Sequence, residues 1–315
     1  MQISSFLVLL LLMSCSTFRK WGIRSATPVF TEASSLNLYE RNWEFFAKSA
    51  PANLKLTEIL YLEDKNNLEM LGILIKGYAG YAFAVPETLY LDARLSGKEG
   101  DEEKADAIDF YTRAFDYGVH YLSLKDIKAS DLLTLPEDKL IKKLNAELDE
   151  DDLLAIFYLA QSWGSLINLQ KDNIGLVSQA PRVKILADFG CKLDPDAENG
   201  FCDLFSAQYD ASRPRVLGGN PAQALETYKK AFEKYPKNLL IRQSYIEQLI
   251  VPAMDEEAFA NQVEILTAEF KDWENLDREE MMDKSSFAKS REINLFNAIA
   301  KKRFEIILKH RSKIF

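Results

Sequence analysis

Small and aromatic residues recur at helical spacing in the stretch 218–236, GGNPAQALETYKKAFEKYP. Ala224, Tyr228 and Ala231 follow one another at intervals of four and three residues, so they share one face of a helix. The two alanines let a second helix approach closely, and Tyr228 fills the space between them. Pro236 then ends the helix. This pattern predicts the second helix of a tetratricopeptide-like hairpin.

The same spacing recurs at two earlier places, which favours a repeated structural unit. Its members there are Ala107, Tyr111 and Ala114, and Val183, Ala187 and Gly190. A single helical hairpin cannot bury its apolar face alone, so three or more have to stack into one core. We therefore expect an all-α fold in which tetratricopeptide-like hairpins stack into a compact solenoid.

Apolar periodicity extends the helical prediction over most of the chain. Further expected helices cover 67–85, 105–120, 153–169, 174–190, 239–251, 255–271 and 287–309. An earlier helix that begins near Trp43 is expected to break at Pro51, and Pro181 is expected to kink the helix in which it lies. The helix at 67–85 is apolar on nearly all sides, so we place it at the centre of the fold.

Aromatic residues on two of these helices are candidates for lining a cavity. They are Tyr78, Tyr81 and Phe83 on the first helix, and Phe157, Tyr158 and Trp163 on the second. The three on the first helix cannot share one helical face. Core packing is the commoner role of such side chains, and the lining of a cavity for an apolar ligand is the alternative.

The first residues have the pattern of a targeting signal. Residues 3–13 are almost unbroken hydrophobic sequence, too short to span a bilayer as a mature helix. The segment Leu12-Met13-Ser14-Cys15 resembles the lipobox of bacterial lipoprotein signals, which implies cleavage after residue 14 and acylation of Cys15. The start of the chain, Met1-Gln2, departs from that pattern because it lacks Lys or Arg, and an ordinary secretory signal is the alternative.

These features divide the chain into three parts. Residues 1–14 are expected to form the signal peptide, and 15–35, which have no periodicity, a lipidated tether that is mobile or draped on the surface. Residues 36–315 are expected to form a single helical domain. Ser16 resembles the residue that accompanies outer-membrane sorting, so the chain is expected to be periplasmic and anchored to the outer membrane by its acyl group.

Two further cysteines, Cys191 and Cys202, flank a short loop. In an oxidising compartment such a pair favours a disulfide, and two buried thiols are the alternative. A zinc site is disfavoured because no histidine or further cysteine lies nearby in the sequence.

Charge and composition disfavour several classes of function. The chain has 39 Lys and Arg against 48 Asp and Glu, with no basic stripe, which argues against nucleic-acid binding. It has two histidines and no nucleophile elbow or phosphate loop, so we expect no enzyme and no cofactor. The acidic run at 147–152 could hold a cation, but capping of the next helix is the simpler interpretation.

Several landmarks together resemble the T-component of tripartite ATP-independent periplasmic (TRAP) transporters. They are Ala50-Pro51 with Leu54 before Glu58, Leu71 to Ala84, Tyr158 to Ile167, Leu193-Asp194-Pro195, Leu217 to Pro221 with Ala224, and Ala298 to Phe315. The resemblance implies an all-helical domain pierced by an apolar-lined pore. It also implies a homotrimer that engages a periplasmic substrate-binding protein and handles hydrophobic small molecules.

The leading hypothesis is therefore a non-enzymatic accessory lipoprotein of a TRAP-type transporter, which binds or conducts an apolar molecule and docks a substrate-binding protein. The alternative is a tetratricopeptide scaffold lipoprotein for protein–protein interactions in cell-envelope assembly. A narrow aromatic tunnel would favour the first hypothesis, and a wide polar groove would favour the second.

Overall fold

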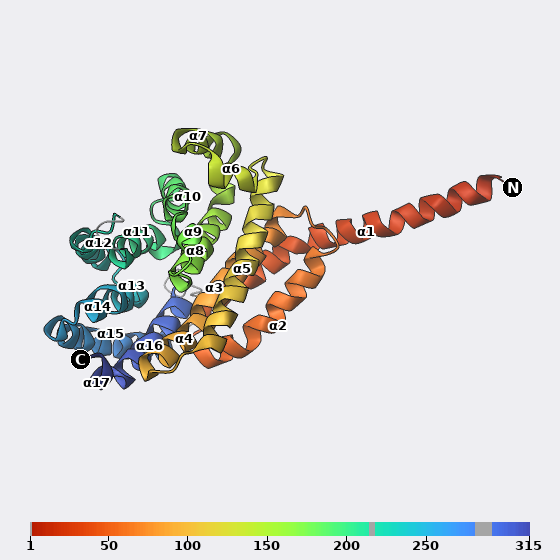
Figure 1. Ribbon diagram of the computed structural model, residues 1–315. Coiled ribbons are helices and arrows are strands. Elements are labelled where there is room, and N and C mark those ends of the chain that lie inside the picture. The colour runs from red at the N-terminus through yellow and green to blue at the C-terminus, as the bar shows by residue number, and fades with distance from the viewer. Residues whose placement is uncertain (1, 214–217, 281–291) are drawn as a thin grey trace.

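The computed structural model describes residues 2–213, 218–280 and 292–315, and the side chains within these ranges except those of 2–18 and 276–280. The described residues form helices joined by turns, without a β-strand among them, so the fold is all-α (Figure 1). The helices are α1 (Gln2–Ser35), η1 (Leu36–Tyr39), α2 (Trp43–Tyr61), α3 (Leu68–Ala84), α4 (Pro86–Ser96), α5 (Asp101–Leu124), α6 (Ala129–Thr134), α7 (Glu137–Glu147), η2 (Glu150–Asp152), α8 (Leu153–Leu169), α9 (Ile174–Val177), α10 (Ala180–Leu193), η3 (Ala197–Asn199), α11 (Phe201–Ser212), α12 (Pro221–Lys234), α13 (Leu239–Tyr245), the π-helix η5 (Ile246–Ile250), α14 (Val251–Ala253), α15 (Glu256–Glu280), α16 (Asn294–Lys309) and α17 (Arg311–Ile314).

Helix α3 lies at the centre of the fold, as its apolar sequence predicts. It packs against α1, α2, α4, α5 and α8. Met70, Leu71, Leu74 and Ile75 are fully buried in these contacts. With α4 it forms the one continuous stretch, among the described residues, that is long and apolar enough to cross a membrane. More than half of that stretch is buried inside the protein, as in the core helix of a soluble domain.

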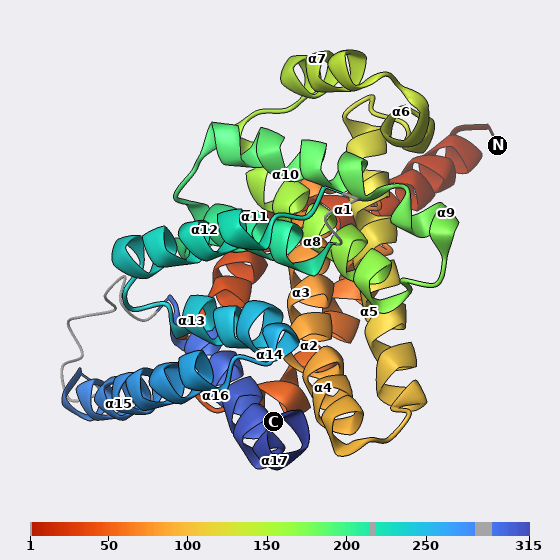
Figure 2. The ribbon, with the colours of Figure 1, turned by 60° about the vertical axis from the view of Figure 1, so that its left-hand side comes forward.

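The remaining helices follow one another around α3 and return to it. α5 packs on α3, α8 packs on both, and α10 packs on α8. The chain then passes through α11, α12 and α13, and α13 packs on α16 (Figure 2). α16 in turn contacts α4 and α2, which lie next to α3. The helices α3, α8, α10, α11, α13, α16 and α4 thus close into a ring.

Polar contacts fasten this closure. Asn297 of α16 accepts a hydrogen bond from the Leu239 amide at 3.0 Å and donates one to the Lys237 carbonyl at 3.1 Å, which joins α16 to the start of α13. On its other side, Lys302 of α16 forms an ion pair with Glu44 of α2 at 3.0 Å. The second pair joins residues 258 positions apart, so α16 connects the last part of the chain to the region around α2.

The nine small and aromatic residues of the repeated pattern are all buried. Tyr228 and Ala231 cluster with Ala207 of α11, on which α12 packs as a hairpin. Gly190 shows why the pattern needs small residues. A Cβ atom there would lie 2.5 Å from Cε1 of Phe157, closer than real contacts allow. The predicted solenoid of tetratricopeptide-like hairpins goes beyond this packing and stays a prediction.

Two prolines act differently from the sequence-based expectation. Pro51 lies inside α2, which runs unbroken from Trp43 to Tyr61, so the expected break is wrong. Phe46, Ala50 and Leu54 are buried around it, and this packing compensates for the one backbone hydrogen bond that proline removes. Pro181 does not kink a long helix but lies in the first turn of α10, after a separate short α9.

The segment expected to be a mobile or draped tether is helical. It continues α1 to Ser35, and from Arg19 onward its side chains contact the body of the protein. The Arg24 guanidinium donates to Asp64 at 2.6 Å, and the buried Thr27 hydroxyl accepts from Asn67 at 3.0 Å. The side chain of Cys15, the predicted acylation site, lies outside the described residues.

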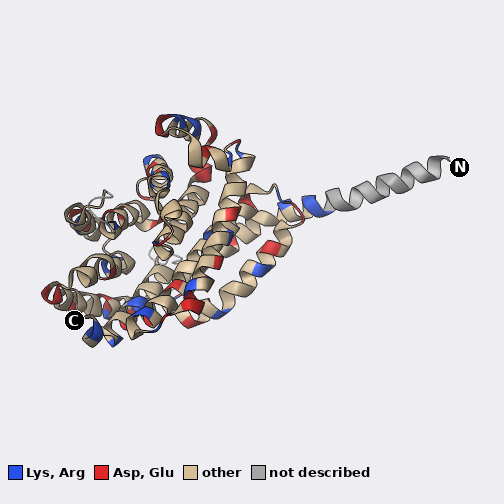
Figure 3. Ribbon diagram, in the orientation of Figure 1, with Lys and Arg blue, Asp and Glu red and all other residues tan. Residues whose placement is uncertain are grey.

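Charged residues of both signs are interspersed over the described helices (Figure 3). α8 differs from the other long helices, because it contains no Lys, Arg, Asp or Glu between Leu153 and Leu169. Twelve of its side chains are buried, including that of Trp163. α8 is therefore mainly a core helix, and the polar side chains that it turns toward the interior of the ring are Tyr158, Gln161, Ser165 and Asn168.

Candidate functional site

A cavity of about 1010 Å³ is lined by the helices of the ring and, on the other side of α3, by residues of α1, η1 and α2. Its volume is at the upper end of the range for small-molecule sites, roughly 300–1,000 Å³. The face of α3 that borders it carries Ile73, Lys76, Gly80 and Phe83 at helical spacing. Apolar side chains from the other helices complete most of the wall, among them Ile167, Leu204, Phe205, Leu240, Leu295 and Ile299.

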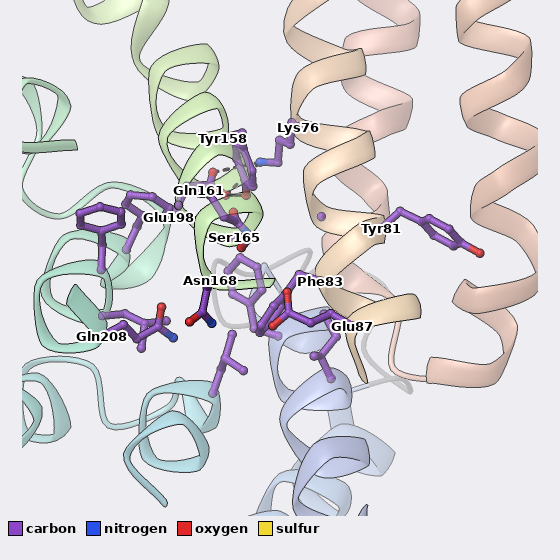
Figure 4. A pocket seen from close by; sticks show the side chains of 18 of the residues that line it. Lys76, Tyr81, Phe83, Glu87, Tyr158, Gln161, Ser165, Asn168, Glu198 and Gln208 are labelled. Carbon is purple, nitrogen blue, oxygen red and sulfur yellow. Dashed lines mark hydrogen bonds and ion pairs between the residues drawn. The ribbon is translucent and has the colours of Figure 1, made fainter. Parts of the chain in front are cut away.

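Three of the six aromatic candidates line this cavity. Phe83 and Tyr158 come from the facing helices α3 and α8, and Figure 4 shows both beside the central space. Tyr81 points away from them, toward the α2 side of α3 (Figure 4). There its ring lies 6.4 Å from that of Phe46. The lining therefore extends to both sides of α3.

The other three candidates belong to the packed core, the commoner of the two roles considered for them. Tyr78 stacks against Tyr117 of α5 with the ring centres 5.9 Å apart. Phe157 is fully buried against Phe201. Trp163 is also buried, and its indole donates to Gln179 at 2.9 Å. Helical periodicity places residues on a face but does not say which neighbour covers that face.

A row of aromatic rings on α11 was missed by the sequence analysis. Phe201, Phe205 and Tyr209 are four residues apart, and successive rings are stacked with centres 6.0 and 6.2 Å apart. All three line the cavity. Their i, i+4, i+8 spacing was the available signal. The row gives the cavity a long apolar surface.

One polar group in the cavity is the carboxylate of Glu198. It accepts from Lys76 at 3.0 Å through both oxygens and from the Tyr158 hydroxyl at 2.5 Å. Burial and the adjacent Glu198 charge raise the pKa of Tyr158 well above its ordinary value, so the hydroxyl stays protonated as the donor. Glu198 belongs to the loop that the Cys191–Cys202 disulfide closes.

A second polar group joins three elements of the ring. Arg303 of α16 donates to Glu247 of η5 through Nε at 3.0 Å and through Nη2 at 2.6 Å. Glu87, in the first turn of α4, lies 3.6 Å from the same Nη2 and accepts from the Tyr111 hydroxyl at 2.5 Å. Glu87, Glu247 and Arg303 all line the cavity. We call these three residues the Glu–Arg–Glu group.

The pKa values of the two glutamates of this group are shifted in opposite directions. Burial raises the pKa of Glu87, although the charge of Arg303 opposes the shift. Burial also acts on Glu247, but there the charge and the hydrogen bonds of Arg303 outweigh it and hold the pKa below the ordinary value. The bidentate pair is therefore Glu247 with Arg303, and Glu87 is the less stabilised carboxylate.

The sequence analysis did not single out the Glu–Arg–Glu group. Arg303 lies in a run of three basic residues, which conceals its position. Arg303 follows Leu295 and Ile299 by eight and four residues, so it shares a helical face with these two apolar residues. A charged residue on an apolar face was the signal that could have identified it. Glu247 lies in a π-helix, a rare local structure that is frequent at functional sites.

The acidic run at 147–152 caps local backbone. Asp149 accepts from the Asp151 amide at 3.0 Å, and Asp152 accepts from the Asp149 amide at 3.0 Å. Among the residues that the structure describes, no three His, Cys, Asp or Glu side chains gather as a metal site would require. The chemistry that the cavity offers is the binding of a molecule with an apolar body.

The comparison with protein families gives one finding for most of the chain. The family model described as TRAP transporter T-component matches residues 40–315. A search of curated proteins finds no match. The matched range contains every helix of the ring and every cavity-lining residue from Phe46 onward.

Proposed function

Because the chain belongs to the TRAP transporter T-component family, and is thus an accessory component of a TRAP transporter, we propose that it binds a hydrophobic small molecule in the cavity within its ring of helices. The protein then passes this molecule to or from a periplasmic substrate-binding protein. It acts without catalysis, in the periplasm, held at the outer membrane through an acylated Cys15.

The observation that carries the proposal is the size and apolar lining of the cavity. Removing apolar surface from water contributes about 25 cal/mol per Å². A ligand that buries about 300 Å² of apolar surface therefore gains about 7 kcal/mol before entropy costs are subtracted. The helices around the cavity and its aromatic walls support a ligand-binding role over the scaffold alternative, which would use a wide polar groove.

Docking of the substrate-binding protein is the second part of the proposal. Exposed apolar side chains on the outer surface of the α2 region support it. Phe45, Ile59 and Leu62 are 60%, 54% and 61% exposed. Apolar side chains at such exposure are suited to the core of a protein interface. The predicted homotrimer would draw on the same kind of surface.

Native mass spectrometry tests the proposal directly. The chain would be produced from residue 16 onward, which keeps every described side-chain contact and leaves no acyl chain to interfere. We expect a mass increment from a co-purified apolar molecule, and a further complex after addition of the cognate substrate-binding protein. A chain that is empty, takes up no added apolar molecule and ignores the binding protein would contradict the proposal.

A further inference from the structure

Glu87 is the one carboxylate of the Glu–Arg–Glu group with an unused acceptor in the cavity. Its Oε2 accepts from Tyr111. Its Oε1 receives no hydrogen bond from any residue that the structure describes, and the nearest Arg303 nitrogen, at 3.6 Å, is beyond hydrogen-bond distance. The side chain is 17% exposed, and Figure 4 shows it pointing into the cavity beside Phe83.

Arg303 makes no hydrogen bond to Glu87 and is directed at other partners. Nε and Nη2 are directed at Glu247, and Nη1 donates to the Thr88 hydroxyl at 3.1 Å. Three nitrogens are thus engaged, and the side chain is only 2% exposed. With both glutamates ionised, the three residues of the group carry two negative charges against one positive charge. The charge of Arg94 also acts on both glutamates, but the pKa of Glu87 stays raised, so its carboxylate is the less stabilised of the two.

Lys76, Lys171 and Arg213 also line the cavity, and the described contacts give none of them an ion pair with Glu87. Lys76 is held by both oxygens of Glu198 at 3.0 Å, at a different part of the cavity (Figure 4). The unused acceptor oxygen of Glu87 and its poorly stabilised charge therefore favour a ligand that brings a positive charge and hydrogen-bond donors of its own.

We propose that the Glu–Arg–Glu group binds the protonated amino group of an amphiphile, with Glu87 as the direct partner and the apolar body of the ligand along the aromatic wall of α11. An ammonium group provides three donors, and one of them reaches the free Oε1 of Glu87. Charge-assisted hydrogen bonds of this kind are about twice as strong as neutral ones. This inference rests on the proposed ligand-binding function and names the head group of its ligand.

Binding of a protonated amine is expected to release a proton. The groups that face Glu87 are Arg303, Glu247, Tyr111 and Arg94. With burial, they leave the pKa of Glu87 raised, so part of the empty protein carries a proton there. The ammonium group favours the ionised carboxylate, and the proton leaves to solvent. Enthalpies of binding measured in buffers of different ionisation enthalpy report this release.

Isothermal titration calorimetry with three ligands of equal chain length tests the inference. Decylamine, decan-1-ol and decanoate would be titrated below their micelle concentrations. We expect decylamine to bind roughly tenfold or more tightly than the alcohol, since charged hydrogen bonds contribute this much. Glu87→Gln should abolish the difference and the proton release while the alcohol binds as before. Glu69→Gln, an exposed first-turn glutamate of α3, is the matched control and should retain both.

The outcomes separate this inference from the function on which it rests. If the alcohol or decanoate binds as tightly as decylamine, or if Glu87→Gln keeps the preference, the cavity binds apolar molecules but the head-group assignment is wrong. If none of the three ligands binds to the folded chain, the proposed function fails, and the assignment of the head group fails with it.

Discussion

Single side chains decide how closely the helices of this protein approach one another. Gly190 on α10 lies against the ring of Phe157 on α8. Gly164 on α8 differs, because a Cβ atom there would meet only Cγ1 of Val183 at 3.5 Å, an ordinary van der Waals distance. The two positions therefore make a matched pair in the same helical contact.

The pair gives a prediction about stability. Gly190→Ala overpacks the contact with Phe157 and should lower the free energy of unfolding by about 1–3 kcal/mol. Gly164→Ala should raise it by up to about 1 kcal/mol, because alanine favours a helix and no clash opposes it. Urea denaturation followed by circular dichroism measures both. Equal effects of the two substitutions would contradict the close approach at Gly190.

Residue-scale features were predictable where they depend on local spacing. The buried positions of Ala107, Tyr111 and Ala114 follow from helical periodicity alone. The partners of Glu87 do not, since its contacts with Tyr111 and Arg303 join residues 24 and 216 positions apart. No pattern within one helix contains that information.

At the scale of elements, the disulfide connects the end of α10 to the start of α11. The loop between them presents Glu198 to Lys76 and Tyr158. Glu198 has a φ angle of +49°, in the left-handed region that costs energy for a residue with a side chain. Closure of the loop therefore fixes the position of a charged group in the cavity wall.

Loss of this bond has a predicted cost. The double variant Cys191→Ser, Cys202→Ser opens a loop with a sequence separation of 11 and should lower the free energy of unfolding by about 2–3 kcal/mol. The ring should still form, because its other contacts are unaffected. Differential scanning calorimetry of the oxidised chain and the variant measures the change. An unchanged melting temperature would contradict a stabilising role for the bond.

Element boundaries were predictable where caps and apolar faces agree. α8 covers 153–169 as expected, and Asn67, which accepts from the Met70 amide at 3.1 Å, starts α3 within a residue of the predicted position. The π-helix η5 was not predictable, because its wider turn depends on packing against α11, α12, α13 and α15. Pro51 was misread because tertiary packing overrides the tendency of proline to end a helix.

At the scale of the whole molecule, the function depends on closure of the ring. Local patterns predict hairpins, but the return of α16 to α4 and α2 joins helices that are far apart in the sequence. The sequence could therefore indicate an all-helical family and an apolar interior without showing which faces surround the cavity. A larger side chain at Gly80 can be used to fill the cavity, because Gly80 lines it and a Cβ atom there would meet nothing within 4 Å.

Titration with N-phenyl-1-naphthylamine, an apolar fluorescent probe, tests most directly whether the ring encloses a binding cavity. The unchanged chain should bind the probe with increased fluorescence. Gly80→Leu should fill the cavity and lower affinity about tenfold or more, as the loss of roughly 1.4 kcal/mol would. Gly72→Leu, on the same helix, outside the cavity lining and equally free of close neighbours, should bind as the unchanged chain does. Equal binding by the two variants would contradict the account.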